Sequence, residues 1–183
     1  MNAMFSNATN FNQDLSNWQV GNVRFFQGMF QRASFFSADL SSWDVSAGEE
    51  FFQMFFLAQR FSSSLSAWDV SSATDMSIMF ALASRFSSDI STWNVAQVTD
   101  MYAMLAFLPL WNVDISAWNV ANVEDLESFL QNSGRFDQDL CVWGSRLAPT
   151  TLVASMFVDS GCLFQDDPDL SIAVPGPFCA ACS

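Results

Sequence analysis

The sequence predicts an α/β solenoid of about six repeated units, each with one short parallel strand and one short helix. Three observations predict this class. Within each unit, an alternating apolar stretch is typical of a strand, and an apolar stripe with helical spacing follows it. The units themselves are marked by a tryptophan every 25 residues, at Trp18, Trp43, Trp68, Trp93, Trp118 and Trp143.

The strand is expected around the repeated tryptophan. The segments Leu65–Val70 and Ile90–Val95 share the spacing L-x-x-W-x-V, which matches the strand part of a leucine-rich repeat, L-x-x-L-x-L. In such a strand the Trp and Val side chains point to one face and the residue between them points to the other. We therefore expect a right-handed, leucine-rich-repeat-like solenoid with one parallel sheet.

A helix of about two turns is expected after each strand. Met101, Met104, Leu105 and Leu108 lie at i, i+3, i+4 and i+7, which makes one apolar stripe of a short helix. Thr99–Asp100 precede this stripe, where an N-cap and a first-turn acid belong. The same interpretation places six acidic residues at helix starts, namely Glu49, Glu50, Asp75, Asp100, Glu124 and Asp125.

The repeats are expected to fill residues 1–145, and residues 146–183 are expected to form a C-terminal cap. Near the cap the repeat frame slips by two residues, so that the next Met-Phe pair is Met156-Phe157. Met1 occupies a repeat position, so the chain is expected to start within a unit. Because a bare solenoid end would expose strand edges and core side chains, we expect a preceding segment or a partner to cover it.

Four cysteines lie in or beside the predicted cap. We favour two disulfides, which would imply an oxidising compartment, either extracellular or at the cell surface. Three pairings are possible, and a Cys₄ zinc site or free thiols are the alternatives. The four residues are Cys141, Cys162, Cys179 and Cys182.

The composition excludes several function classes. The formal net charge is −13, all six basic residues are arginines, and the chain contains no histidine. So acidic a chain is not expected to bind nucleic acid, because that affinity needs clustered cations. Without histidine there is no His-based triad and no imidazole metal site, so we expect no enzyme and no cofactor. The chain shows no signal peptide and no apolar run long enough for a membrane helix.

The repeat resembles that of BspA-like surface proteins, a relative of the leucine-rich repeats. The pattern M-F-x-x-A-x-x-F-x-x-D-L/I-S-x-W-x-V-x-x-V-T-D-M is best preserved from Met79 to Met101, and the resemblance covers roughly residues 1–145. It implies a non-enzymatic adhesion or protein-binding function at a cell surface. It carries over no catalytic residues.

A separate series of aspartates occurs once per unit, just before the Leu or Ile. We expect each carboxylate to accept backbone N–H groups within its turn. Bridging of neighbouring carboxylates by Ca²⁺ is the alternative. The series consists of Asp14, Asp39, Asp89, Asp114 and Asp139.

The residue between Trp and Val forms a candidate concave face. Small polar side chains in a row can bind an extended ligand, although a merely solvated face would carry the same residues. The row consists of Gln19, Asp44, Asp69, Asn94 and Asn119.

A candidate protein interface lies on the predicted helix side of the three central units. One position there is polar in the outer units (Asn7, Arg32 and Asn132) but apolar in the central ones, and contiguous exposed apolar groups usually mark an interface. We expect a protein partner or self-association through this patch. A thicker apolar core and a lipid-facing surface are the alternatives to an interface. A structural subunit of an extracellular filament or membrane-associated complex is the alternative function. The candidate interface residues are Phe52, Phe56, Leu57, Ile78, Leu82 and Phe107.

Overall fold

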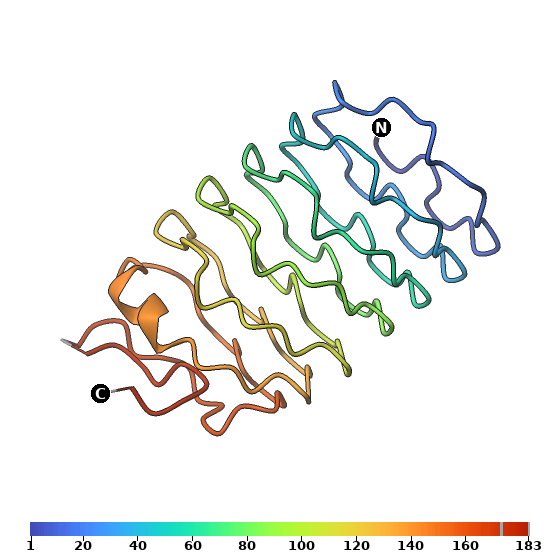
Figure 1. The fold of residues 1–183 in the computed structure, drawn as a ribbon. Coiled ribbons are helices and arrows are strands. Elements are labelled where there is room, and N and C mark those ends of the chain that lie inside the picture. Colours follow the sequence, from blue (N-terminus) through green and yellow to red (C-terminus); the bar gives the residue numbers. More distant parts are fainter. Residues whose placement is uncertain (173, 183) are drawn as a thin grey trace.

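The computed structural model describes residues 1–172 and 174–182. The chain winds as a stack of similar coils along one axis, with the N-terminus at one end of the stack and the C-terminus at the other (Figure 1). Within the described residues, the single regular helix is the 3₁₀ helix η1 (Cys141–Ser145), and the backbone pairing consists of isolated bridges. No helix in this part of the chain is long and apolar enough to cross a membrane.

Each coil is a succession of tight turns. In the coil that begins at Met76, the Met79 N–H donates to the Met76 carbonyl (3.2 Å) and the Ala83 N–H donates to the Phe80 carbonyl (2.9 Å). The Phe86 N–H then donates to the Ala83 carbonyl (2.8 Å). These are i→i+3 bonds, which close β-turns rather than an α-helix.

Other N–H groups link one coil to the next. The N–H of Ile78 donates to the carbonyl of Tyr102 (2.8 Å), and the N–H of Leu82 donates to that of Ala106 (3.1 Å). The same 24-residue step recurs in the neighbouring coils, so backbone groups that the turns leave free are paired between coils. One parallel bridge per coil continues this pairing, along the series Phe25, Glu50, Asp75, Asp100, Asp125 and Leu152.

The predicted α/β leucine-rich-repeat class is wrong, because the unit contains no helix. An α-helix needs negative φ throughout and N–H groups that bond four residues back. Ile78 has φ 58° and Leu82 has φ 62°, and both N–H groups leave the coil instead. Successive turns bury residues in the order Met76, Met79, Phe80 and Ala83, which copies the apolar spacing of a helix.

The predicted strand is also absent. The N–H of Trp93 closes a turn on the Ile90 carbonyl (3.1 Å), so the L-x-x-W segment bends instead of extending. The expected alternation of side chains is nevertheless present, since Trp93 and Val95 are buried and Asn94 is exposed. The parallel bridges between coils fall elsewhere, four residues before the Met-Phe pair of a unit, as at Asp75 for Met79-Phe80.

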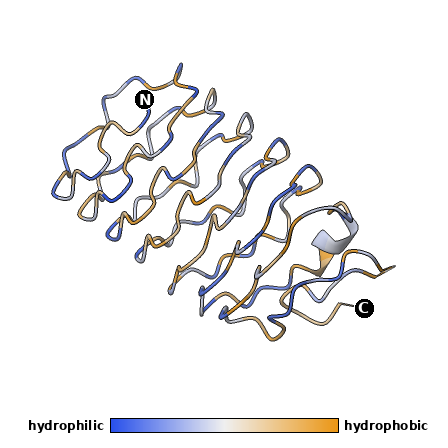
Figure 2. Ribbon diagram, turned by 180° about the vertical axis from the view of Figure 1, so that it is seen from behind, coloured by the Kyte–Doolittle hydropathy of each residue, from blue (hydrophilic) through white to orange (hydrophobic). Residues whose placement is uncertain are grey.

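The core consists of apolar columns that run through the stack. Phe55 stacks on Phe80 of the next coil with ring centroids 5.6 Å apart, and on Phe61 of its own coil at 3.9 Å. Trp68 stacks on Trp93 at 6.5 Å. Apolar and polar stretches alternate along every coil, as Figure 2 shows. Burial of these columns therefore depends on stacking of the units.

At the C-terminal end, the coil spacing increases from 25 to 27 residues, because Asp125 pairs with Leu152. Coil-to-coil bonds continue as far as Gly161, whose N–H donates to the carbonyl of Ser133 (3.3 Å). The tail packs closely against η1, where the carbonyl of Pro175 would lie 3.0 Å from a Cβ at Gly144.

The four cysteines form two disulfides, Cys141–Cys182 and Cys162–Cys179. The expected disulfides are confirmed, and the structure selects one pairing of the three. Because all four sulfur atoms form disulfide bonds, the zinc-site and free-thiol alternatives are excluded. The disulfides indicate an oxidising compartment.

Candidate functional site

The candidate interface lies on the side of the stack that the helices were expected to occupy. We call this side the turn face. Its inward side chains, such as Met79 and Phe80, are fully buried, whereas Ile78 and Leu82 point outward and are half-buried. The turn face consists of residues 1–10, 26–35, 51–60, 76–85, 101–110 and 126–135.

Two positions in each coil of the turn face adopt a left-handed backbone. The third residue of a type II turn needs a positive φ, which glycine and asparagine adopt most readily. The first column of such residues has φ between 48° and 59° and consists of Ala3, Gly28, Gln53, Ile78, Ala103 and Ser128. The second column has φ between 57° and 62° and consists of Asn7, Arg32, Leu57, Leu82, Phe107 and Asn132.

Bulky apolar residues occupy these positions only in the central coils. Leu57, Leu82 and Phe107 stand where the outer coils carry the polar residues Asn7 and Asn132. A left-handed conformation costs a residue with a Cβ atom about 1–2 kcal/mol. The central coils therefore pay a conformational penalty to present apolar side chains outward.

The structure brings the six candidate interface residues together on three consecutive coils. Phe107 is 39% exposed, and the other five are half-buried. Sequence reasoning missed Tyr102, which is also 39% exposed and stands two coils beyond Phe52 in the same column. Its register in the repeat could have identified it. We call this set the central patch, which comprises Phe52, Phe56, Leu57, Ile78, Leu82, Tyr102 and Phe107.

The N-terminal side of the central patch is bordered by amides. The Gln31 Nε2 atom donates to Gln53 Oε1 (2.7 Å), and Asn2 Nδ2 donates to Gln27 Oε1 (2.8 Å). On the other side, the patch is bordered by the coil of residues 126–135, which contains the polar residues Glu127, Gln131 and Asn132. An apolar centre with a polar border is the usual anatomy of a protein interface.

The candidate concave-face residues form an exposed row with a local structural role. Asp44 Oδ1 accepts the N–H of Ser46 (3.1 Å), and Asn94 Oδ1 accepts that of Ala96 (3.2 Å). The hydroxyl of Ser46, followed by its N–H, lowers the pKa of Asp44. The same N–H bond occurs at Asp69 and Asn119. Gln19 is exposed at the start of the row.

The turn-forming series of aspartates behaves as expected. Asp14 Oδ1 accepts the N–H of Ser16 (2.8 Å), and Asp89 Oδ1 accepts that of Ser91 (3.0 Å). The backbone N–H bonds lower the pKa values of both carboxyls. The same bond at Asp39, Asp114 and Asp139 confirms the predicted role of the series. Within the described residues, no group of three or more His, Cys, Asp or Glu side chains could hold a metal ion.

The acids that were assigned to helix starts have a different position. Asp75, Asp100 and Asp125 occupy consecutive bridge positions, and each accepts the N–H of the residue two positions later. Asp100 is half-buried, and its burial, together with the charges of Asp75 and Asp125, raises its pKa. These acids therefore form a column of neighbouring carboxylates rather than helix caps.

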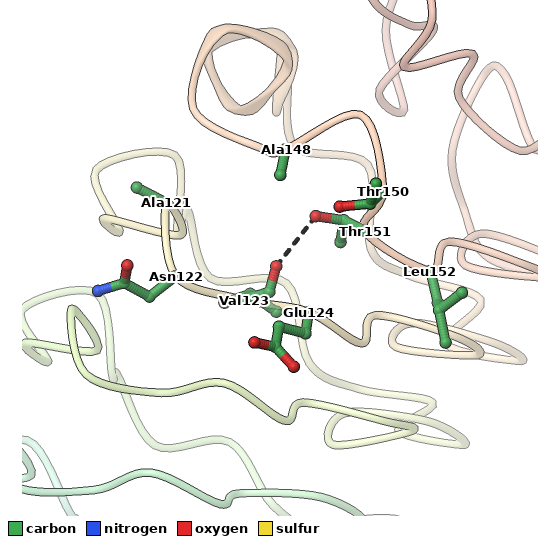
Figure 3. Close-up of a pocket in the computed structure, with 8 residues that line it drawn as sticks. All are labelled: Ala121, Asn122, Val123, Glu124, Ala148, Thr150, Thr151 and Leu152. Carbon is green, nitrogen blue, oxygen red and sulfur yellow. Dashed lines mark hydrogen bonds between the residues drawn. The ribbon is translucent and has the colours of Figure 1, made fainter.

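A cleft of about 500 Å³ opens where the coil spacing increases to 27 residues (Figure 3). The Thr151 hydroxyl donates to the Val123 carbonyl across its floor (3.0 Å). Glu124 is the single carboxylate among the eight lining residues, and Asn122 lies beside it. The cleft offers hydrogen-bonding groups without a paired acid and base, which general acid–base chemistry would need.

These features define a tandem-repeat protein with a disulfide-bonded C-terminal end. The chain belongs to the family described as "Mycoplasma protein of unknown function, DUF285", whose family model matches residues 1–91 and again residues 57–168. Two overlapping matches to one family model are what a tandem repeat produces. The family description does not name BspA-like proteins. No curated protein and no solved structure matches the chain.

Proposed function

We propose that this chain is a non-enzymatic, extracellular repeat protein that binds a protein partner through the central patch. The observation that carries the proposal is the left-handed conformation of Leu57, Leu82 and Phe107. Backbone strain of this kind persists where the surrounding structure or a function requires it. Since the outer coils use polar residues in the same column, folding does not require apolar ones there.

The exposed chemistry of the central patch fits a protein partner. Its side chains are apolar or aromatic, and aromatic residues are enriched in protein interfaces. They form a contiguous set over three coils. Apolar residues scattered singly over a surface are normal, whereas a contiguous set indicates an interaction site. The polar border would remain in contact with water.

The rest of the molecule supports a non-catalytic role outside the cell. Two disulfides are favoured in an oxidising compartment. The exposed aspartates of the turns are engaged by backbone N–H groups, which favour their ionised form and suit them poorly to proton transfer. The absence of histidine and lysine from the sequence removes two common catalytic side chains.

Leu82→Asn tests the proposal. Asparagine accepts the left-handed backbone, so the variant should fold at least as well as the wild type while the centre of the patch becomes polar. The tagged protein is expressed in the organism that encodes it, and flow cytometry measures how much of the protein is bound to the cell surface. We expect a loss of about ten-fold or more in partner binding, as for a central interface residue.

Asn132→Gly is the matched control, because it lies in the same column outside the patch and keeps a residue suited to positive φ. Its binding should equal that of the wild type. Retention of a folded Leu82→Asn protein at the wild-type level would refute the proposal. If light scattering shows that the isolated wild type forms an oligomer that Leu82→Asn dissolves, the patch serves a structural subunit instead.

A further inference from the structure

We infer that the partner presents carboxylates, and that the turn face takes an acidic, extended protein segment along the axis of the stack. This inference rests on the proposed function, because it assigns the chemistry of the partner for the same face. It is carried by the distribution of charge over the molecule.

Acidic residues are excluded from most of the turn face. The chain has 19 Asp and Glu residues, yet none lies in residues 1–10, 26–35, 51–60, 76–85 or 101–110. Glu127 in the last coil of this face is the exception. The acidic bridge column Glu50, Asp75, Asp100 and Asp125 borders the first residues of this face, whereas Arg60, Arg85 and Arg135 lie at its last residues.

Most of the arginines lie on the turn face. Two of the six have internal roles. Arg24 pairs with Glu49 (2.7 Å), and this is the one ion pair within the described residues 1–172 and 174–182. Arg146 Nη1 donates to the carbonyls of Ser116 (2.7 Å) and Trp118 (2.6 Å). The other four are exposed and all lie on the turn face, namely Arg32, Arg60, Arg85 and Arg135.

Three of these arginines form a row beside the second left-handed column. Arg60 follows Leu57 by three residues, and Arg85 follows Leu82 in the same way. The guanidinium of Arg60 lies over the exposed ring of Phe35, 4.0 Å from its centroid, which holds the cation at the surface. The row ends at Arg135, with Leu110 occupying the coil between.

The geometry of the row favours a linear ligand. Arg60 and Arg135 are three coils apart, which at about 5 Å per coil spans roughly 15 Å along the axis. An extended segment covers this length in about five residues. Its carboxylates would meet Arg60, Arg85 and Arg135, and its apolar side chains would meet the parallel column of Leu57, Leu82 and Phe107.

A membrane surface fits this face less well than a protein does. The most exposed side chains of the central patch, Tyr102 and Phe107, are only 39% exposed, so the patch is shallow and offers little to insert into lipid. A bilayer anionic enough to attract four arginines would also repel a chain of net charge −13. Neither limit applies to a short acidic segment that contacts only the turn face.

The test uses a fluorescent peptide of about 15 residues, in which glutamate alternates with leucine, and the same peptide with glutamine for glutamate. Anisotropy is measured with the full chain in low salt. We expect the acidic peptide to bind about ten-fold more tightly, since three exposed ion pairs contribute up to about 0.5 kcal/mol each. Arg60→Gln and Arg85→Gln should each weaken binding roughly two-fold, and about 0.5 M salt should remove the preference.

Arg24→Gln is the control, because Arg24 lies outside the turn face and is already paired with Glu49. It should leave peptide binding unchanged. The inference is overturned if neither peptide binds, if the glutamine peptide binds equally well, or if Arg60→Gln and Arg85→Gln have no effect.

Two other results would assign a different occupant and would also overturn the inference. One is preferential cosedimentation of the chain with phosphatidylserine vesicles. The other is a salt-sensitive oligomer of the chain alone that Arg85→Gln dissolves. If Leu82→Asn abolishes cell binding while the arginine variants retain it, the proposed function stands and only the acidic partner is refuted.

Discussion

The indole N–H of Trp93 donates a hydrogen bond to the backbone carbonyl of Leu65, 3.0 Å away and 28 residues earlier in the chain. Because Leu65 belongs to the preceding coil, the bond ties two coils together through a buried side chain. The tryptophan column is therefore both an apolar core and a series of inter-coil hydrogen bonds. The same bond joins Trp43 to Leu15, Trp68 to Leu40, and Trp118 to Ile90.

Replacing Trp93 by Phe should cost more stability than the same change at Trp143. Trp93→Phe removes the indole donor, while the Leu65 carbonyl still accepts the Trp68 N–H (3.0 Å), so the loss should be about 0.5–1.5 kcal/mol beyond the lost packing. Trp143 is equally buried, but its Nε1 atom has no hydrogen-bond partner. Urea unfolding of both variants measures the difference, and equal losses would show that the indole bond contributes nothing.

Asp100→Asn should stabilise the protein at neutral pH. Asparagine keeps an oxygen for the N–H of Tyr102 and removes a charge whose pKa is raised by burial and, to a smaller extent, by repulsion from Asp75 and Asp125. The gain should be about 0.5 kcal/mol, because the carboxylate is only half-buried and solvent screens part of the repulsion.

The gain from Asp100→Asn should depend on pH in a defined direction. A raised folded-state pKa means that the ionised carboxylate destabilises the fold above that pKa, and that the penalty disappears as pH falls through it. Thermal melts should therefore converge with the wild type in acid. At Asp89 the Ser91 N–H lowers the pKa, so Asp89→Asn should give no gain at neutral pH. A pH-independent gain at Asp100 would contradict this explanation.

Ile78→Asn should stabilise the coil that contains it. Ile78 has φ 58°, which is unfavourable for a β-branched side chain. The equivalent residue two repeat units earlier, Gly28, adopts φ 59° without strain. We expect a gain of up to about 1 kcal/mol in the free energy of unfolding, reduced by the lost apolar contact. Ser84→Asn, at a position with ordinary φ, should change stability little. A loss at Ile78 as large as that of a core deletion would show that its side chain holds the fold.

Removing either disulfide should lower the melting temperature. The Cys141–Cys182 pair closes a loop with a sequence separation of 41, for which chain entropy predicts roughly 4 kcal/mol. The Cys162–Cys179 pair, with a separation of 17, should contribute roughly 3 kcal/mol. Calorimetry of the two double serine variants gives both values. A wild-type melt that reductant leaves unchanged would count against a stabilising role for the pair.

Much of the packing could be predicted from the sequence. The period, the inward-facing positions and the turn role of Asp14 and Asp89 all follow from residue types at fixed spacing. Two disulfides could be expected from four cysteines near one end, although their pairing could not be. The register of the repeat also aligns Tyr102 with Phe52 and aligns Arg60 with Arg135, but only the structure shows that these side chains are exposed.

The secondary structure could not be predicted, for a physical reason. An apolar pattern reports which side chains are buried, and a helix and a pair of turns bury the same residues from Met76 to Ala83. The difference lies in where the N–H groups of Ile78 and Leu82 find their acceptors, which are in the next coil. Sequence by itself thus determined a stacked repeat with an apolar interior and a cross-linked end. Only the tertiary structure decided that the unit is made of turns, because inter-coil hydrogen bonds offset the cost of left-handed residues that an isolated unit could not hold.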